Sequence, residues 1–164
     1  MENKSKTIDS RTSPFGLLII GKDFKRACEI ISEKCPDKHS SLPNTDLYKV
    51  RLYLIGHAFE LLFKSILLQC GVALAVLRSK KFGHDIIALE NKIEEFALFP
   101  LSETEKALLS LLNEYYKAKD FEYHVRGAKQ YPYLSELIHL GDRLFAAGEK
   151  WLRGQSVKKA IIKL

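Results

Sequence analysis

The residues with the clearest capacity for chemistry lie in one apolar stretch of the chain. Three ionisable groups and a tyrosine recur there at intervals of three and four, as Tyr53, His57, Glu60 and Lys64. In a helix these positions share a narrow arc, because successive residues turn by about 100°. Charges are costly to bury unpaired, so we expect Glu60 and Lys64 to form an ion pair, with His57 one turn before Glu60.

This stripe of polar residues supports two interpretations. A neutral imidazole held by a carboxylate is positioned for acid–base chemistry or for contact with phosphate. Alternatively, His57, Glu60 and Lys64 form a structural polar network at a helix crossing or a dimer seam.

A second polar pair, His84 and Asp85, follows Gly83 at the start of a helical pattern. Asp85 could orient His84, and the free N–H groups at the helix start could bind an anion. Asp85 could instead cap the helix and favour its dipole, which requires no activity. Both interpretations predict a helix that begins near His84.

The third candidate is the segment 121–133, which has no clear helical or strand period. Basic and aromatic side chains are interleaved in it, namely Tyr123, His124, Arg126, Lys129, Tyr131 and Tyr133. This mixture suits a single-stranded nucleic acid, with arginine on phosphate and tyrosine stacked on bases. Tyrosines also pack long loops onto helical bundles, so a structural role is the alternative.

Several common sites are missing from the sequence. It contains no GxxxxGK[ST], GxGxxG or HExxH motif and no hydrolase nucleophile elbow. The five histidines have no metal-ligand spacing with cysteine, so we expect no metal site and no cofactor. Three cysteines cannot all pair and form no CxxC, which favours a reducing, cytoplasmic compartment.

Helices must position all of these candidates, because no segment shows convincing strand alternation. With 164 residues, 46% hydrophobic and 28% charged, the chain is sized for one soluble domain. We expect an all-α, up-and-down bundle of about five helices over residues 14–154. A disordered arm, 1–13, precedes the bundle, and a basic tail, 155–164, follows it.

Turn and capping signals bound the expected helices. They span residues 15–34, 45–70, 84–99, 102–119 and 132–153, with a short helix at 73–79. Asn44 or Asp46 is the expected N-cap of the second long helix, and S-E-T-E from Ser102 is a capping box. Gly154 is the expected end of the last helix.

Charge and hydropathy narrow the function classes. The net charge is +6, but five of those six charges lie in the last fifteen residues. RNA contact therefore depends on residues 123–133, with help from the tail. The apolar run 52–68 is too short for a membrane span and contains three ionisable residues, so a buried bundle helix is expected.

The order of these motifs resembles bacterial HEPN-like proteins (higher eukaryote and prokaryote nucleotide-binding). The resemblance covers about residues 15–153 and rests on residues 53–71, Lys81-Phe-Gly-His84-Asp85-Ile, Tyr115-Tyr116 and Tyr131-Pro132. It implies a helical bundle that dimerises through its long helices. Many relatives are metal-independent ribonucleases in toxin–antitoxin or defence systems, so RNA and an antitoxin-type protein are implied partners.

The catalytic motif of that family is an arginine, four to six residues and a histidine. The resemblance implies that the arginine holds phosphate while the histidine acts as acid or base as the 2′-hydroxyl attacks. Arg51-LYLIG-His57 fits this spacing, although Leu52 follows the arginine where a polar residue is usual. Their side chains also point about 120° apart on an ideal helix.

At the later position, where the motif more often lies, the chain reads Arg126-GAKQ-Tyr131, with tyrosine in place of histidine. Two hypotheses follow. One is an RNA-directed HEPN-like enzyme, or its inactive RNA-binding relative, with Arg51, His57 and Arg126 as site residues. The other is a non-catalytic dimeric interaction module with a structural polar network in its core.

Overall fold

The structure, a computed structural model, describes residues 11–35, 47–123 and 129–161, with side chains described as far as residue 155. Over these ranges the chain folds into six helices and no strands. The helices are α2 (Pro14–Lys34), α3 (Tyr48–Gln69), α4 (Leu74–Leu77), α5 (Ile86–Glu94), α6 (Glu103–Lys117) and α7 (Leu134–Ile161). The prediction of an all-α bundle is confirmed.

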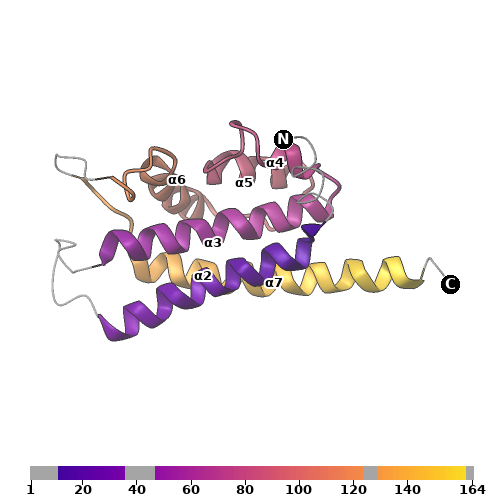
Figure 1. The fold of residues 1–164 in the computed structure, drawn as a ribbon, viewed down its shortest axis with the longest axis horizontal. Coiled ribbons are helices and arrows are strands. Elements are labelled where there is room, and N and C mark those ends of the chain that lie inside the picture. The colour runs from indigo at the N-terminus through magenta and orange to yellow at the C-terminus, as the bar shows by residue number, and fades with distance from the viewer. Residues whose placement is uncertain (1–10, 36–46, 124–128, 162–164) are drawn as a thin grey trace.

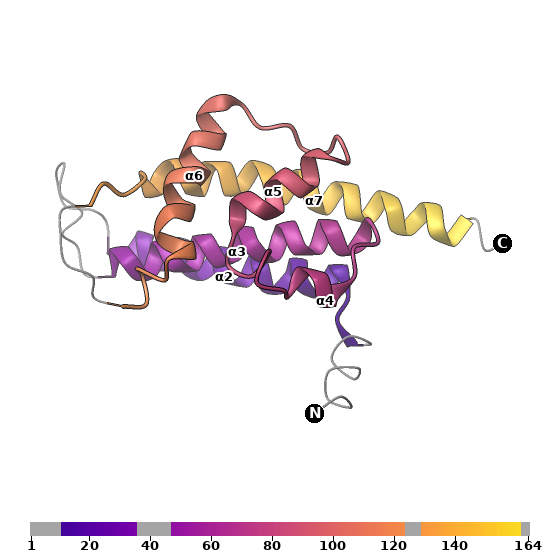
Figure 2. The same ribbon diagram turned by 90° about the horizontal axis from the view of Figure 1, so that it is seen from above.

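Helix α3 is the centre of the bundle. It runs antiparallel to α2, with α7 beside both, while α5 and α6 lie across its other side (Figure 1). The same arrangement is visible from above in Figure 2, where the last turns of α7 extend beyond the other helices. This placement brings residues of α3, α5 and α6 together even though they are far apart in sequence.

The burial of α3 explains its composition. Leu52, Ile55, Phe59, Leu62 and Ile66 are at most 2% exposed and form one face, and Ala58 and Leu67, both 0% exposed, lie on either side of that face. A helix covered by neighbours on most of its surface can be apolar nearly all round. It is long and apolar enough to cross a membrane, but 67% of its most apolar window is buried inside the bundle. This burial supports the prediction that α3 is a buried helix of the bundle.

Serine side chains cap the starts of two helices. Ser13 caps α2, its hydroxyl accepting from the Gly16 N–H at 3.0 Å. At the start of α6, the Ser102 hydroxyl accepts from the Glu105 N–H, and the Glu105 carboxylate accepts from the Ser102 N–H at 2.8 Å. The predicted capping box is therefore confirmed.

Other predicted boundaries were wrong. Helix α3 starts at Tyr48 after Leu47, which has a left-handed φ of 75° and no side-chain cap. The expected caps, Asn44 and Asp46, lie outside the described residues. Helix α5 ends at Glu94 rather than near residue 99, where Ala97 and Phe99 both have positive φ.

Helix α7 also departs from the prediction, because it continues through Gly154 to Ile161. A glycine inside a helix costs only about 1 kcal/mol relative to alanine, and the residues around Gly154 favour helix enough to absorb that cost. The predicted tail, 155–164, therefore begins as part of α7. The predicted arm, 1–13, lies mostly outside the described residues.

Candidate functional site

The polar stripe predicted on α3 is present in the structure. The Tyr53 ring stacks on His57, with centroids 5.9 Å apart and planes within 5°. One turn further along, the Lys64 ammonium donates to Glu60 Oε1. Glu60 is 3% exposed and Lys64 8% exposed. The expected Glu60–Lys64 ion pair is confirmed and is buried.

Two further side chains from other segments meet this pair. Tyr116 of α6 donates its hydroxyl to Glu60 Oε2 at 2.6 Å, and its Oη lies 2.9 Å from His57 Nδ1. His84 Nδ1, from the loop before α5, lies 3.1 Å from Glu60 Oε2. We call these five residues, His57, Glu60, Lys64, His84 and Tyr116, the Glu60 cluster.

A glycine on α3 lets Tyr116 reach Glu60. A Cβ atom added at Gly56 would lie 2.8 Å from Tyr116 Cδ2, well inside van der Waals contact. Helix α6 can therefore cross α3 closely enough for the tyrosine hydroxyl to reach the carboxylate. Sequence reasoning gave Tyr116 no role in the site, and a glycine beside His57 inside an apolar helix was the one signal of this close contact.

The position of His84 depends on a second carboxylate. Asp85 caps α5 by accepting from the Ala88 N–H at 3.0 Å, and it pairs with Lys117 at 2.6 Å. Asn113 of α6 donates to Asp85 and accepts from the Ile86 N–H at 2.8 Å. The structural interpretation of Asp85 therefore describes the observed contacts.

The functional interpretation of the His84-Asp85 pair does not match this geometry. The carboxylate that contacts His84 is that of Glu60. The N–H groups of Ile86 and Ala88, which an anion at the helix start would use, already bond to Asn113 and Asp85. Burial opposes ionisation of Asp85, but Lys117, the Ala88 N–H and Asn113 together lower its pKa. Asp85 is thus an anchor for the loop that presents His84.

Protonation within the Glu60 cluster follows from its contacts. Burial alone would raise the pKa of Glu60, but the contacts with His57, Lys64 and Tyr116 together hold it far below its ordinary range. Burial and the Glu60 charge both raise the pKa of Tyr116. The carboxylate is therefore ionised at neutral pH, and the tyrosine hydroxyl keeps its proton and donates it.

The residues of the cluster differ in solvent exposure. The side chains of Glu60 and Lys64 are 4% and 11% exposed, whereas those of His57 and His84 are 21% and 39% exposed. Phe24 of α2 packs edge-on against His57, at 4.5 Å between centroids. The buried ion pair therefore forms a floor, and the two imidazoles lie between that floor and solvent.

Arg51 is not among these solvent-facing groups. It is 1% exposed, and its Cζ lies 5.3 Å from the centre of the Tyr48 ring. The Arg51-x₅-His57 spacing therefore does not place a guanidinium at the exposed side of the cluster. Two further basic site candidates, His124 and Arg126, lie outside the described residues.

The predicted nucleic-acid segment divides into anchoring and exposed residues. Lys129 pairs with Asp120 and lies over the Tyr115 ring at 5.4 Å, with its side chain only 12% exposed. Tyr131 packs against Tyr48 and Tyr115, with centroids 6.2 and 4.9 Å apart. Lys129 and Tyr131 therefore attach the segment to the bundle.

Tyr123 and Tyr133 differ from these anchors, because they are 65% and 71% exposed. Among the described residues of this segment, they are the aromatic rings that solvent can reach most freely. A base could stack on them without any rearrangement of the bundle.

Three donor atoms in the cluster also suit a metal ion. One ligand atom each from His57, Glu60 and His84 lie within 4.8 Å of one another. The spacing of histidine and cysteine along the sequence could not indicate this group, because His84 joins the other two only through the packing of the α4–α5 loop on α3.

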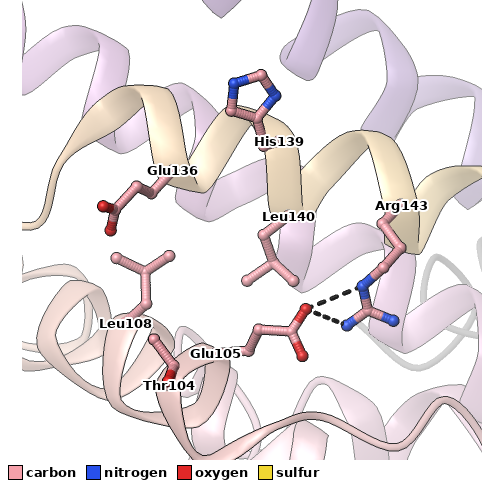
Figure 3. A pocket seen from close by; sticks show the side chains of 7 residues that line it. All are labelled: Thr104, Glu105, Leu108, Glu136, His139, Leu140 and Arg143. Atoms are coloured by element: carbon pink, nitrogen blue, oxygen red, sulfur yellow. Dashed lines mark hydrogen bonds and ion pairs between the residues drawn. The ribbon is translucent and has the colours of Figure 1, made fainter.

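A separate groove lies between α6 and α7, with a volume of about 300 Å³. Figure 3 shows its lining residues: Thr104, Glu105, Leu108, Glu136, His139, Leu140 and Arg143. Arg143 Nε donates to Glu105 at 2.9 Å across the groove, so these two charges neutralise each other. His139 is exposed, and its ring points away from this pair. The groove shares no residue with the Glu60 cluster.

The chain has no match among protein-family models, curated proteins or solved structures. The HEPN-like resemblance therefore stays a prediction that rests on the motifs of the chain. The geometry of the Glu60 cluster is what supports a functional hypothesis.

Proposed function

We propose that this is an RNA-directed, HEPN-like protein in which His57 and His84 carry out metal-independent acid–base cleavage. The observation that carries this proposal is the convergence of two part-exposed imidazoles on one buried carboxylate. Nδ1 of His84 lies 3.1 Å from Glu60 Oε2, and Nδ1 of His57 lies 3.6 Å from the same atom. A toxin–antitoxin or defence role is the context that the resemblance implies.

The chemistry needs one base and one acid. The base takes the proton of the 2′-hydroxyl as its oxygen attacks phosphorus, giving a 2′,3′-cyclic phosphate, and the acid protonates the departing 5′-oxygen. Because Nδ1 of both rings faces the cluster, Nε2 on the opposite edge of each ring is the atom that meets substrate. The Glu60 carboxylate and the Tyr116 hydroxyl fix the two rings in orientation.

Substrate binding also needs positive charge for phosphate and aromatic surfaces for stacking. Arg51 is too buried to contact phosphate, so Arg126 and the lysines near the C-terminus are the proposed phosphate contacts. The exposed rings of Tyr123 and Tyr133 are the proposed stacking surfaces.

A second candidate function is a non-catalytic, dimeric interaction module. The observation that favours it is the completeness of the network: Glu60 has Lys64 on one oxygen and Tyr116 and His84 on the other. A satisfied buried network stabilises one packing of the helices without any activity. In that case the two histidines complete the network and have no substrate.

An RNA cleavage assay in EDTA separates the two functions. We expect the wild type to cleave single-stranded RNA, and His57→Ala and His84→Ala to reduce the rate by at least about 100-fold. His139→Ala is the matched control, because it removes an exposed histidine outside the cluster, and it should leave the rate unchanged. Arg126→Ala tests phosphate contact and should weaken RNA binding.

Each variant should first be checked for native helicity and an unchanged oligomeric state. Absence of cleavage and of RNA affinity at low salt in the wild type would overturn the proposal and favour the interaction module. RNA binding without cleavage would show that this protein is an inactive, RNA-binding relative of the ribonucleases.

A further inference from the structure

We infer that the Glu60 cluster binds a divalent transition-metal ion such as Zn²⁺ through His57 Nδ1, Glu60 Oε2 and His84 Nδ1. This replaces the expectation from sequence spacing that the protein has no metal site. The binding itself does not depend on the proposed ribonuclease activity.

The distances between the donor atoms are close to those of a zinc site. With bonds of about 2.0–2.1 Å to a tetrahedral ion, neighbouring ligand atoms lie about 3.3 Å apart. Glu60 Oε2 is 3.1 Å from His84 Nδ1 and 3.6 Å from His57 Nδ1. One nitrogen of the His57 ring and one of the His84 ring lie within 4.8 Å of each other. Rotation of the 39% exposed His84 side chain can shorten this last separation.

The donor types also select the class of ion. Two imidazoles and one carboxylate form a known zinc ligand set, whereas Mg²⁺ and Ca²⁺ prefer oxygen ligands. The second carboxylate oxygen, Glu60 Oε1, is held by Lys64, and such outer contacts orient metal ligands. The Lys64 charge also offsets that of Glu60, so we expect weaker binding than at a structural zinc site with thiolate ligands.

The Tyr116 hydroxyl lies where the ion would bind. Its Oη is 2.6 Å from Glu60 Oε2, 2.9 Å from His57 Nδ1 and 3.5 Å from His84 Nδ1. A cation can therefore enter only if this hydroxyl gives up its hydrogen bonds with the same three atoms. It follows that Tyr116→Phe, which removes the hydroxyl and keeps the ring, should bind metal more tightly than the wild type.

Metal binding would also regulate the proposed cleavage, and this consequence rests on the proposed function. An imidazole whose Nδ1 is bound to a metal keeps its Nε2 proton at neutral pH. Such a ring can neither take a proton from the 2′-hydroxyl nor become the imidazolium that protonates the leaving oxygen. Both His57 and His84 would lose their acid–base roles at once. The geometry thus predicts that Zn²⁺ inhibits RNA cleavage.

Calorimetric titration of the full chain with Zn²⁺ tests the inference, with Mg²⁺ as the ion that should not bind. We expect one site per chain whose affinity falls at least tenfold in His57→Ala and in His84→Ala and stays unchanged in His139→Ala. The three cysteines are free thiols and can also bind zinc, so the titration alone does not locate the ion. NMR of the histidine side-chain nitrogens locates it, because we expect zinc to change the chemical shifts of His57 and His84.

Equal zinc affinity in the wild type and both cluster variants would overturn the inference, as would shifts confined to other residues. Weaker binding in Tyr116→Phe would overturn the three-ligand arrangement. If His57→Ala fails to fold, His84→Ala decides, because His84 is more exposed and lies in a loop. Failure of the proposed function would appear separately, as no cleavage in EDTA by a protein that still binds zinc.

Discussion

At the scale of single residues, Glu60 determines the properties of the cluster. One of its oxygens accepts from Lys64 and the other from Tyr116, while His84 approaches the same second oxygen. Sequence periodicity predicted the Glu60–Lys64 pair because both residues lie on one helix. It could not predict Tyr116 as a partner, since that contact depends on how α6 crosses α3.

Removal of the carboxylate should destabilise the fold. Glu60→Leu leaves the Lys64 ammonium buried without its partner, and we expect a loss of about 3 kcal/mol in the free energy of unfolding. Urea unfolding measures this loss. The double variant Glu60→Leu/Lys64→Met is the control and should recover most of it, because no buried charge is left. An unchanged midpoint in the single variant would show that Lys64 is solvated without Glu60.

Acidification should have a related effect. The pKa of Glu60 is lowered in the folded state, so its contribution to stability is complete above its ordinary value of about 4.5 and is lost as the pH falls below it. Between about pH 4 and pH 2, wild-type stability should fall more steeply than that of Glu60→Gln, by up to about 1.4 kcal/mol per pH unit. Parallel acid profiles of the two proteins would contradict a lowered pKa at this residue.

At the scale of elements, the crossing of α3 and α6 creates the cluster. Local signals predicted that both helices exist: the Ser102 capping box gave the start of α6, and the apolar run identified α3 but not its first residue. The crossing itself depends on Gly56, whose missing side chain makes room for the Tyr116 ring. The end of α7 shows the opposite case, in which a glycine lies in a helix with open space around it.

Two alanine substitutions test this difference between glycines. Gly56→Ala should destabilise the protein by about 1–3 kcal/mol, because the new methyl group overlaps the Tyr116 ring. Gly154→Ala has nothing within 4 Å of its new Cβ and should stabilise α7 by about 0.5–1 kcal/mol. Thermal unfolding of both variants measures whether each substitution lowers or raises the stability relative to the wild type. Stabilisation by Gly56→Ala would show that α6 does not cross α3 this closely.

At the scale of the whole molecule, most of the net positive charge lies away from the packed core. Five of the six net positive charges lie in residues 150–164, toward the end of α7, whose last turns extend beyond the bundle (Figures 1 and 2). Among the side chains of α7 that the structure describes, the buried ones extend as far as Leu152, and Trp151 packs edge-on against Phe99. We therefore expect these charges to serve binding with little cost to folding.

Truncation after Gln155 tests this separation. The shortened chain lacks three lysines, and we expect a melting temperature within about 2 °C of the wild type, because the described core is intact. If the lysines bind RNA, the slope of log affinity against log salt should become shallower by up to about 2, at about 0.7 for each phosphate that is no longer neutralised. An unchanged slope would exclude these lysines from the RNA interface.

The sequence by itself determined the helical class, the central apolar helix and the pairing of Glu60 with Lys64. Those features follow from short-range rules, since periodicity, capping and i,i+4 spacing act within one helix. Only the tertiary structure decided that Arg51 is buried, that Asp85 anchors a loop, and that His84 and Tyr116 meet Glu60. These outcomes depend on helix crossings between distant segments, where a single glycine sets how closely two side chains approach.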